Sequence, residues 1–232
     1  MSQLHVRFLV LAIALLTFVP TAPAAGGEIQ GHVVLGGPVP PAKKVPVTID
    51  QYVCGKEKDA GDLVLSAARE IQNVVVWLQN PPPGAPSPVA ASTPQMDQKE
   101  CVFVPRVVLA PAGGTVEFLN SDRLLHNLHG APKANNPFNR TQPKGRTIAI
   151  AFARPEIIRI DCDLHSWMRG WVVVADHPFY AITDATGRFK FDNVPPGQYT
   201  LQVWHERLGR RTSTVTVSGD APTPVNIDLR AR

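Results

Sequence analysis

Short apolar runs, each ended by a turn, follow one another along the chain and restrict it to β structure. Candidate strands are residues 29–35, 74–78, 102–109, 115–119, 147–152, 156–162 and 171–174. Glycine and proline clusters separate them, and several short strands between such turns are typical of a β-sandwich or barrel. Residues 59–70 show no convincing amphipathic stripe, so no substantial helix is expected there. The sequence predicts an all-β fold.

The sequence changes character at residues 176–178. In the following segment, Tyr199, Leu201 and Val203 share one face of a strand, because strand side chains alternate. Residues 212–217 and 225–229 supply further strands. We predict a second, small sandwich over 177–232, which is small enough to need packing against the first. The first unit, 26–176, carries an N-terminal β extension and a proline-rich loop at 81–94.

The first 25 residues have the features of a secretory signal peptide. Arg7 precedes a run at 8–19 that is apolar except for Thr17, and small residues at 22–25 suit cleavage. A retained anchor is the alternative, although the run is short for a membrane span. We therefore expect a periplasmic or secreted protein with no membrane span after cleavage. Loss of Arg7 takes the formal net charge from +4 to +3, which argues against a nucleic-acid partner.

The chain has three cysteines, which is an odd number for an exported protein. Cys54 and Cys101 lie outside the metal-like cluster described next, and an oxidising compartment favours their pairing. We predict a Cys54–Cys101 disulfide, with two free thiols as the alternative. Cys162 is left over.

Cys162, His165 and Met168 lie three residues apart on one short segment between two predicted strands. His126, which follows the strand ending near residue 119, offers a second imidazole. One thiolate, two imidazoles and a weak axial thioether are the ligand set of a blue-copper electron-transfer site. Zinc is the competing metal, because a cysteine and two histidines can hold it with water in the fourth position. His129 could be a rim residue, an alternate ligand or a surface histidine, and we favour the surface interpretation.

The segment Cys162-Asp163-Leu164-His165-Ser166-Trp167-Met168, with Asn120-Ser121-Asp122 and His126-Asn127 upstream, resembles the plastocyanin, pseudoazurin and amicyanin group of cupredoxins. The resemblance covers residues 101–175. It implies a cupredoxin-like Greek-key β-sandwich with one type 1 copper near one end. Carried onto this chain, it makes His126, Cys162, His165 and Met168 the copper ligands. Asn127 would hydrogen-bond the ligand loop and hold the thiolate in place.

Two departures from that family concern the surface of the ligand loop. Trp167 and Arg169 are expected to give it a bulkier and more charged surface than the small apolar patch typical of cupredoxins. The identity of a redox partner is therefore open.

The C-terminal part resembles carboxypeptidase regulatory-like, transthyretin-like domains. The resemblance rests on a Gly-x-Phe-x-Phe pattern at 187–191 and a Val-Pro-Pro-Gly-x-Tyr-x-Leu pattern at 194–201. It implies a non-catalytic structural or interaction module.

These features favour a copper protein that shuttles single electrons between redox partners, such as a cytochrome or a dehydrogenase. A copper carrier or sequestering protein would use the same ligands, and a metal-free interaction protein would use none of them. An enzyme is not expected, because the sequence shows no nucleophile elbow, phosphate-cradling loop or dinucleotide fingerprint. A copper oxidase would also need a second copper centre, for which no ligand set is apparent.

Overall fold

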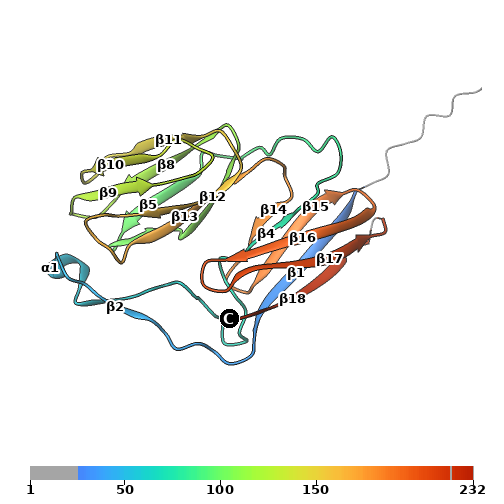
Figure 1. Ribbon diagram of the computed structural model, residues 1–232, viewed down its shortest axis with the longest axis horizontal. Coiled ribbons are helices and arrows are strands. Elements are labelled where there is room, and N and C mark those ends of the chain that lie inside the picture. The colour runs from blue at the N-terminus through green and yellow to red at the C-terminus, as the bar shows by residue number, and fades with distance from the viewer. Residues whose placement is uncertain (1–25, 220, 232) are drawn as a thin grey trace, which may run out of the picture.

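The computed structural model describes residues 26–231 except residue 220. The predicted signal peptide, 1–25, lies outside these residues. Within the described part, no helix has the length and apolar character needed to cross a membrane. Two β-sandwiches lie end to end (Figure 1), and the predicted all-β fold is confirmed.

The first sandwich consists of two sheets around one core. In strand order, the first sheet is β10 (Phe138–Gln142), β9 (His126–Gly130), β12 (Glu156–Asp161), β13 (Arg169–Ala175) and β7 (Val107–Pro111). The second is β11 (Ile148–Phe152), β8 (Gly114–Asn120), β5 (Gln95–Lys99) and β6 (Val102–Val104). The pairs β5–β8 and β7–β13 are parallel. Parallel neighbours need crossover connections, so this sandwich is more than a series of hairpins.

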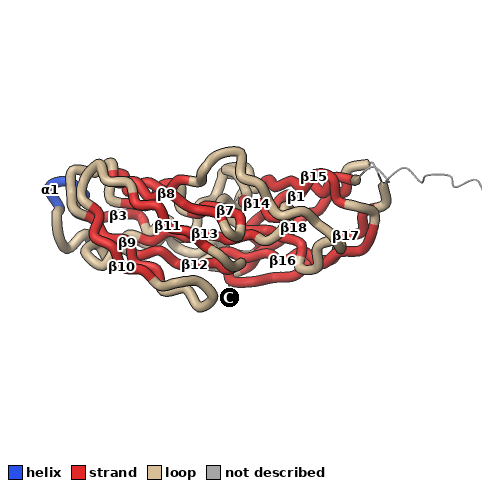
Figure 2. Tube along the Cα trace, turned by 90° about the horizontal axis from the view of Figure 1, so that it is seen from above, coloured by secondary structure: helices blue, strands red, loops and turns tan. Residues whose placement is uncertain are grey.

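A short arm extends along the first sandwich. It comprises β2 (Lys44–Pro46), the one-turn helix α1 (Gln51–Cys54) and β3 (Glu57–Asp59), and β2 pairs with β3 in a two-stranded sheet of its own. Helix α1 lies at the tip of the molecule that is farthest from β15 and β17 (Figure 2).

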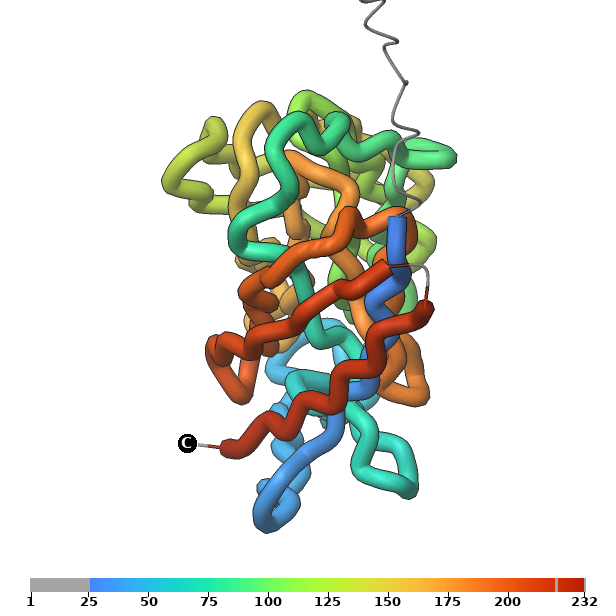
Figure 3. Tube along the Cα trace, turned by 90° about the vertical axis from the view of Figure 1, so that its right-hand side faces the viewer, coloured from blue at the N-terminus to red at the C-terminus, as the bar shows by residue number. Residues whose placement is uncertain are grey.

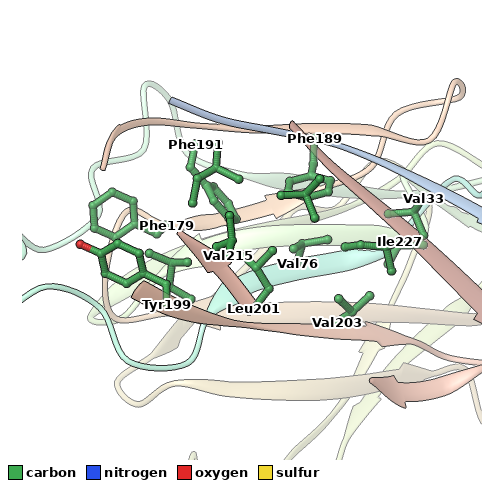
Figure 4. Close-up of a cluster of buried hydrophobic side chains, with 14 of the residues drawn as sticks. Val33, Val76, Phe179, Phe189, Phe191, Tyr199, Leu201, Val203, Val215 and Ile227 are labelled. Atoms are coloured by element: carbon green, nitrogen blue, oxygen red, sulfur yellow. The ribbon is translucent and has the colours of Figure 1, made fainter. Parts of the chain in front are cut away.

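The second sandwich also has two sheets. One is β15 (Arg188–Val194), β1 (Gly27–Gly36) and β18 (Thr223–Arg230). The other is β14 (Tyr180–Ile182), β4 (Val75–Leu78), β16 (Gly197–His205) and β17 (Gly209–Val217). Apolar side chains from both sheets meet between them, including Phe189 on β15, Val76 on β4 and Leu201 on β16 (Figure 4). The alternation predicted for β16 holds, because Tyr199, Leu201 and Val203 are all buried.

The boundary between the units differs from the prediction. The expected N-terminal extension is not part of the first sandwich, since β1 runs parallel to β18 from Ile29 to Gly36, as Figure 3 shows. Strand β4 likewise lies between β14 and β16. The apolar pattern of a strand indicates that it is buried but not which strands it pairs with. The second sandwich therefore includes two strands from the N-terminal third of the chain.

The two sandwiches pack on each other through an apolar and aromatic cluster. Trp171 of β13 and Trp204 of β16 meet edge to face, with ring centroids 4.8 Å apart. Beside them, Arg106 and Glu206 form a two-pronged ion pair, and their side chains are only 15% and 9% exposed. A planar guanidinium matched to a carboxylate in this way fixes orientation as well as distance. The expected packing of the small sandwich on the first is thus present.

Three strands of the first sandwich were missed by the sequence analysis: β5, β9 and β10. Their sequences are mostly polar, yet Met96 and Gln98 of β5 are fully buried. Gln98 is buried because its amide donates to the Gln142 side-chain oxygen at 2.6 Å. The predicted loop at 81–94 contains no strand, as expected for a proline-rich segment.

His205, at the end of β16, makes the stability of this fold sensitive to acid. It is 2% exposed, and burial lowers its pKa from 6.5 to about 4. The neutral imidazole of the folded state takes up a proton on unfolding between these two pH values. The contribution of neutral His205 to the free energy of unfolding is therefore fully present above pH 6.5 and is lost as the pH falls towards 4. The difference between the two pKa values corresponds to about 3 kcal/mol of unfolding free energy.

We predict that a His205→Gln variant loses most of this acid sensitivity. Urea unfolding of the wild type and the variant at neutral and acid pH measures it. His129→Gln, which removes a half-exposed imidazole, is the control and should keep the wild-type drop. An equal drop in wild type and His205→Gln would contradict the assignment.

Candidate metal centre

Three side chains from two loops converge at the tip of the first sandwich. His126 begins β9, Cys162 directly follows β12, and His165 lies in the connection to β13. The Nδ1 atoms of the two imidazoles are 2.9 Å apart. The Cys162 Sγ lies 4.0 Å from Nδ1 of His126 and 3.6 Å from Nδ1 of His165. All three side chains are buried, with exposures of 0%, 2% and 0% in chain order.

A buried asparagine positions His126. Asn120 ends β8, and its amide donates to the carbonyl oxygens of Leu124 and Gln142 at 2.9 Å each. These bonds close the loop before β9, while Gln142 pairs with His126 across the β9–β10 ladder. The backbone of His126 is therefore held by the closed loop that precedes it and by its pairing with β10.

The ligand loop is a tight turn closed by its own backbone. The Met168 N–H donates to the His165 carbonyl at 2.8 Å, and the Cys162 N–H donates to the Met168 carbonyl at 3.4 Å. Met168 is 1% exposed and shares the buried apolar cluster of Cys162. Its role as an axial ligand stays a prediction.

Trp167 corrects the expectation of a bulky loop surface. It is buried, and its indole N–H donates to the carbonyl of Cys101 at 3.0 Å. Arg169 does reach the surface, where its guanidinium donates to Asp161 at 3.0 Å. A tryptophan can be buried when its indole N–H finds a hydrogen-bond acceptor, and here the Cys101 carbonyl is that acceptor.

Asn127 makes the contacts expected of a residue that holds the ligand loop. Its backbone N–H points at the Cys162 Sγ at 3.4 Å. Its side-chain oxygen accepts from the Asp163 N–H at 2.8 Å, and its amide donates to Asn139. The N–H near the sulfur favours a thiolate, because it stabilises the charged form.

Two carboxylates orient the imidazoles. Nε2 of His126 is 2.8 Å from Asp122, and Nε2 of His165 is 3.0 Å from Asp50. An ionised carboxylate only accepts hydrogen bonds, so this network assigns the hydrogen of each neutral ring to Nε2. Each Nδ1 then presents a lone pair to the other and to the sulfur. Lone pairs that face each other at 2.9 Å repel, and a metal cation bound between them would relieve that repulsion.

Burial favours the neutral forms of His126 and Cys162. It lowers the pKa of His126, against the opposing effect of the hydrogen bond to Asp122. It also raises the pKa of the Cys162 thiol, although the N–H groups of Asn127 and of two loop residues act in the opposite direction. A metal that binds the thiolate must therefore displace a proton.

The donor set fits a soft or borderline metal ion. Metal bonds of roughly 2.0–2.3 Å to nitrogen and sulfur place the ligand atoms about 3–4 Å from one another, which is the spacing found here. A thiolate with two imidazoles suits copper or zinc. The residues therefore could hold either metal, with His126, Cys162 and His165 as ligands.

His129 lies outside this set. Its side chain is 42% exposed and bonds Asp163 at 2.7 Å, as the surface interpretation predicted. Cys101, Asp122 and His126 also lie within reach of one another, but Cys101 is not a free thiol. It forms the predicted disulfide with Cys54, whose Cα lies 5.5 Å from its own.

Sequence reasoning missed Asp50 and Asp122. Asp122 stands four residues before His126, a spacing that could have suggested a contact. Asp50 is 115 residues from His165, so no local pattern could have linked them.

One comparison with known proteins agrees with the resemblance of the C-terminal part. A family model for the carboxypeptidase regulatory-like domain matches residues 169–230. A comparison with curated protein sequences gave no match.

Solved structures that align with this chain include three copper-protein or cupredoxin structures. Amicyanin from Paracoccus versutus is 23% identical over 43% of this chain and 97% of its own, with a TM-score of 0.33. A purple cupredoxin from Nitrosopumilus maritimus is 21% identical over 35% of this chain and 99% of its own, with a TM-score of 0.32. A copper-containing nitrite reductase from Thermus scotoductus is 24% identical over 40% of this chain but only 27% of its own, with a TM-score of 0.35.

The disulfide should contribute strongly to stability. It closes a 47-residue separation, for which the chain-entropy estimate is about 4 kcal/mol. We predict that the Cys54→Ser/Cys101→Ser double variant loses roughly 3–4 kcal/mol of unfolding free energy in urea. Cys162→Ser, which leaves the disulfide intact, is the control. An unchanged urea midpoint in the double variant would show that the disulfide adds nothing to stability.

Proposed function

We propose that this protein is a type 1 copper protein of the periplasm that carries single electrons between redox partners. The observation that carries the proposal is the convergence of the Cys162 sulfur with the Nδ1 atoms of His126 and His165. All three side chains are buried. Copper would supply the one-electron change between its two oxidation states.

Hydrogen bonds within the protein hold the candidate ligand atoms in place. The two imidazoles are fixed by carboxylates, and the sulfur by the Asn127 N–H, so the ligand atoms have little freedom to move. A site whose ligands stay in place loses little energy to rearrangement when an electron arrives. Burial also keeps water from occupying a ligand position.

Exposed apolar side chains stand beside the two histidines in the chain and on the arm. Leu125 and Leu164, the residues immediately before the two histidines, are 48% and 45% exposed, and Tyr52 of α1 is 83% exposed. We propose that a redox protein docks on this end, which brings its own centre near the metal. The proposed export rests on the signal-peptide pattern and on the disulfide, since disulfides persist in oxidising compartments.

A copper carrier or sequestering protein is the second candidate. The observation that favours it is the closure of the site, because neither imidazole has any exposed surface. A closed site retains its metal well. We propose no catalytic reaction for this site.

We predict that adding Cu(II) to the purified protein produces an intense visible thiolate-to-copper absorption and binds one equivalent of copper. Cys162→Ser should abolish the absorption, while His129→Gln, which removes a nearby non-ligand imidazole, should keep it. Visible and electron-spin-resonance titrations measure both. A colourless protein without stoichiometric copper would exclude the proposed function.

The kinetics separate the two candidates. An electron carrier should exchange electrons quickly and reversibly with cytochromes. Tight retention of Cu(I), followed by its transfer to another apo-protein, would support copper carriage instead.

A further inference from the structure

We infer that the arm, residues 44–59, is a cap over the metal centre, with Asp50 as a positioning residue for His165. The inference deepens the proposed copper site and rests on it. It assigns a role to a segment that lies outside the two sheets of the first sandwich.

The cap is seated in the core of the first sandwich. Val47 and Cys54 are 1% and 3% exposed and belong to the same apolar cluster as Cys162. Gln51 donates from its side chain to the Val47 carbonyl at 2.6 Å. Lys58 donates to the carbonyl of Glu100 at 2.7 Å, which ties the far strand of the arm to the β5–β6 turn.

The backbone of Asp50 is held in an uncommon conformation. Its φ is 55° and its ψ is 33°, in the left-handed region, which aspartate tolerates better than most residues. Its carbonyl accepts from the N–H groups of Val53 and Cys54 at 3.0 Å each. The backbone that carries this carboxylate is therefore fixed, and the carboxylate meets Nε2 of His165.

The disulfide connects the supports of both imidazoles. Asp50 is tied through its carbonyl to Cys54. On the other side, the Cys101 N–H donates to Asp122, the partner of His126, at 2.8 Å, and the Cys101 carbonyl accepts from Trp167 of the ligand loop. The disulfide thus links the two carboxylates and the ligand loop through the hydrogen bonds of its two cysteines.

The cap explains the burial of His165. Leu164, immediately before it, is 45% exposed, whereas His165 has no exposed surface. The outward Nε2 edge faces Asp50, whose side chain is 27% exposed. The cap therefore separates the imidazole from solvent and, through the charge of Asp50, makes it a stronger donor to a metal at Nδ1.

The cap is tested first without metal. Diethylpyrocarbonate reacts with accessible imidazoles, and mass spectrometry of the apo-protein gives the rate at each histidine. In the wild type His165 should react much more slowly than exposed His129, and Asp50→Ala should raise the His165 rate several-fold. Tyr52→Ser, which changes an exposed side chain in the helix that directly follows Asp50, is the matched control and should leave the rate unchanged. An unchanged His165 rate in Asp50→Ala overturns the cap.

The positioning role is tested on the copper-loaded protein. Asp50→Asn keeps a hydrogen-bond acceptor but removes the charge, and loss of such a partner typically weakens metal affinity 10–100-fold. We expect that loss in competition with a chelator, together with a shifted visible band and reduction potential, and partial rescue by Asp50→Glu. Circular dichroism checks that each variant is folded.

The outcomes are distinguishable from failure of the proposed function. If the wild type binds no copper, the proposed function is wrong, while the diethylpyrocarbonate rates still decide whether the arm covers His165. A wild type that binds copper, with Asp50→Asn equal to it in affinity, spectrum and potential, overturns the positioning role alone.

Discussion

The candidate site depends on the two carboxylate–imidazole hydrogen bonds. Without them each ring could rotate or carry its hydrogen on either nitrogen, and the lone pairs would not face one point. Asp122 reaches His126 at 2.8 Å and Asp50 reaches His165 at 3.0 Å. Because both carboxylates are anchored at the Cys54–Cys101 disulfide, the arm contributes to the candidate site although it lies far from His165 in sequence.

The second sandwich supports this end of the molecule indirectly. It fixes β13 through the Trp171–Trp204 contact and the loop before β7 through the Arg106–Glu206 pair. Strand β13 begins directly after the ligand loop. The small sandwich itself includes β1 and β4 from the N-terminal part of the chain. Dividing the chain at a single position therefore does not separate the two sandwiches. This arrangement suits a rigid scaffold rather than a pair of domains on a linker.

Sequence patterns predicted the strands with strong apolar alternation, the disulfide and the candidate ligands His126, Cys162 and His165, whose side chains do converge. They failed for β5 and β10, where polar residues such as Gln98 and Gln142 are buried by bonding to each other. They also placed Trp167 on the surface, because its partner, the Cys101 carbonyl, is 66 residues away. Burial of a polar group depends on whether an acceptor is near in space, and that cannot be read from its neighbours in sequence.

The sequence by itself determined the chemistry on offer: a thiol and an imidazole three residues apart, a second imidazole after a strand, and a β scaffold to hold them. Only the tertiary structure decided that Asp50 and Asp122 hold the rings, that the arm covers His165 and that β1 belongs to the second sandwich. The reason is physical. Residue types follow from local sequence, whereas hydrogen bonds and strand pairings across 100 residues or more exist only once the chain has folded.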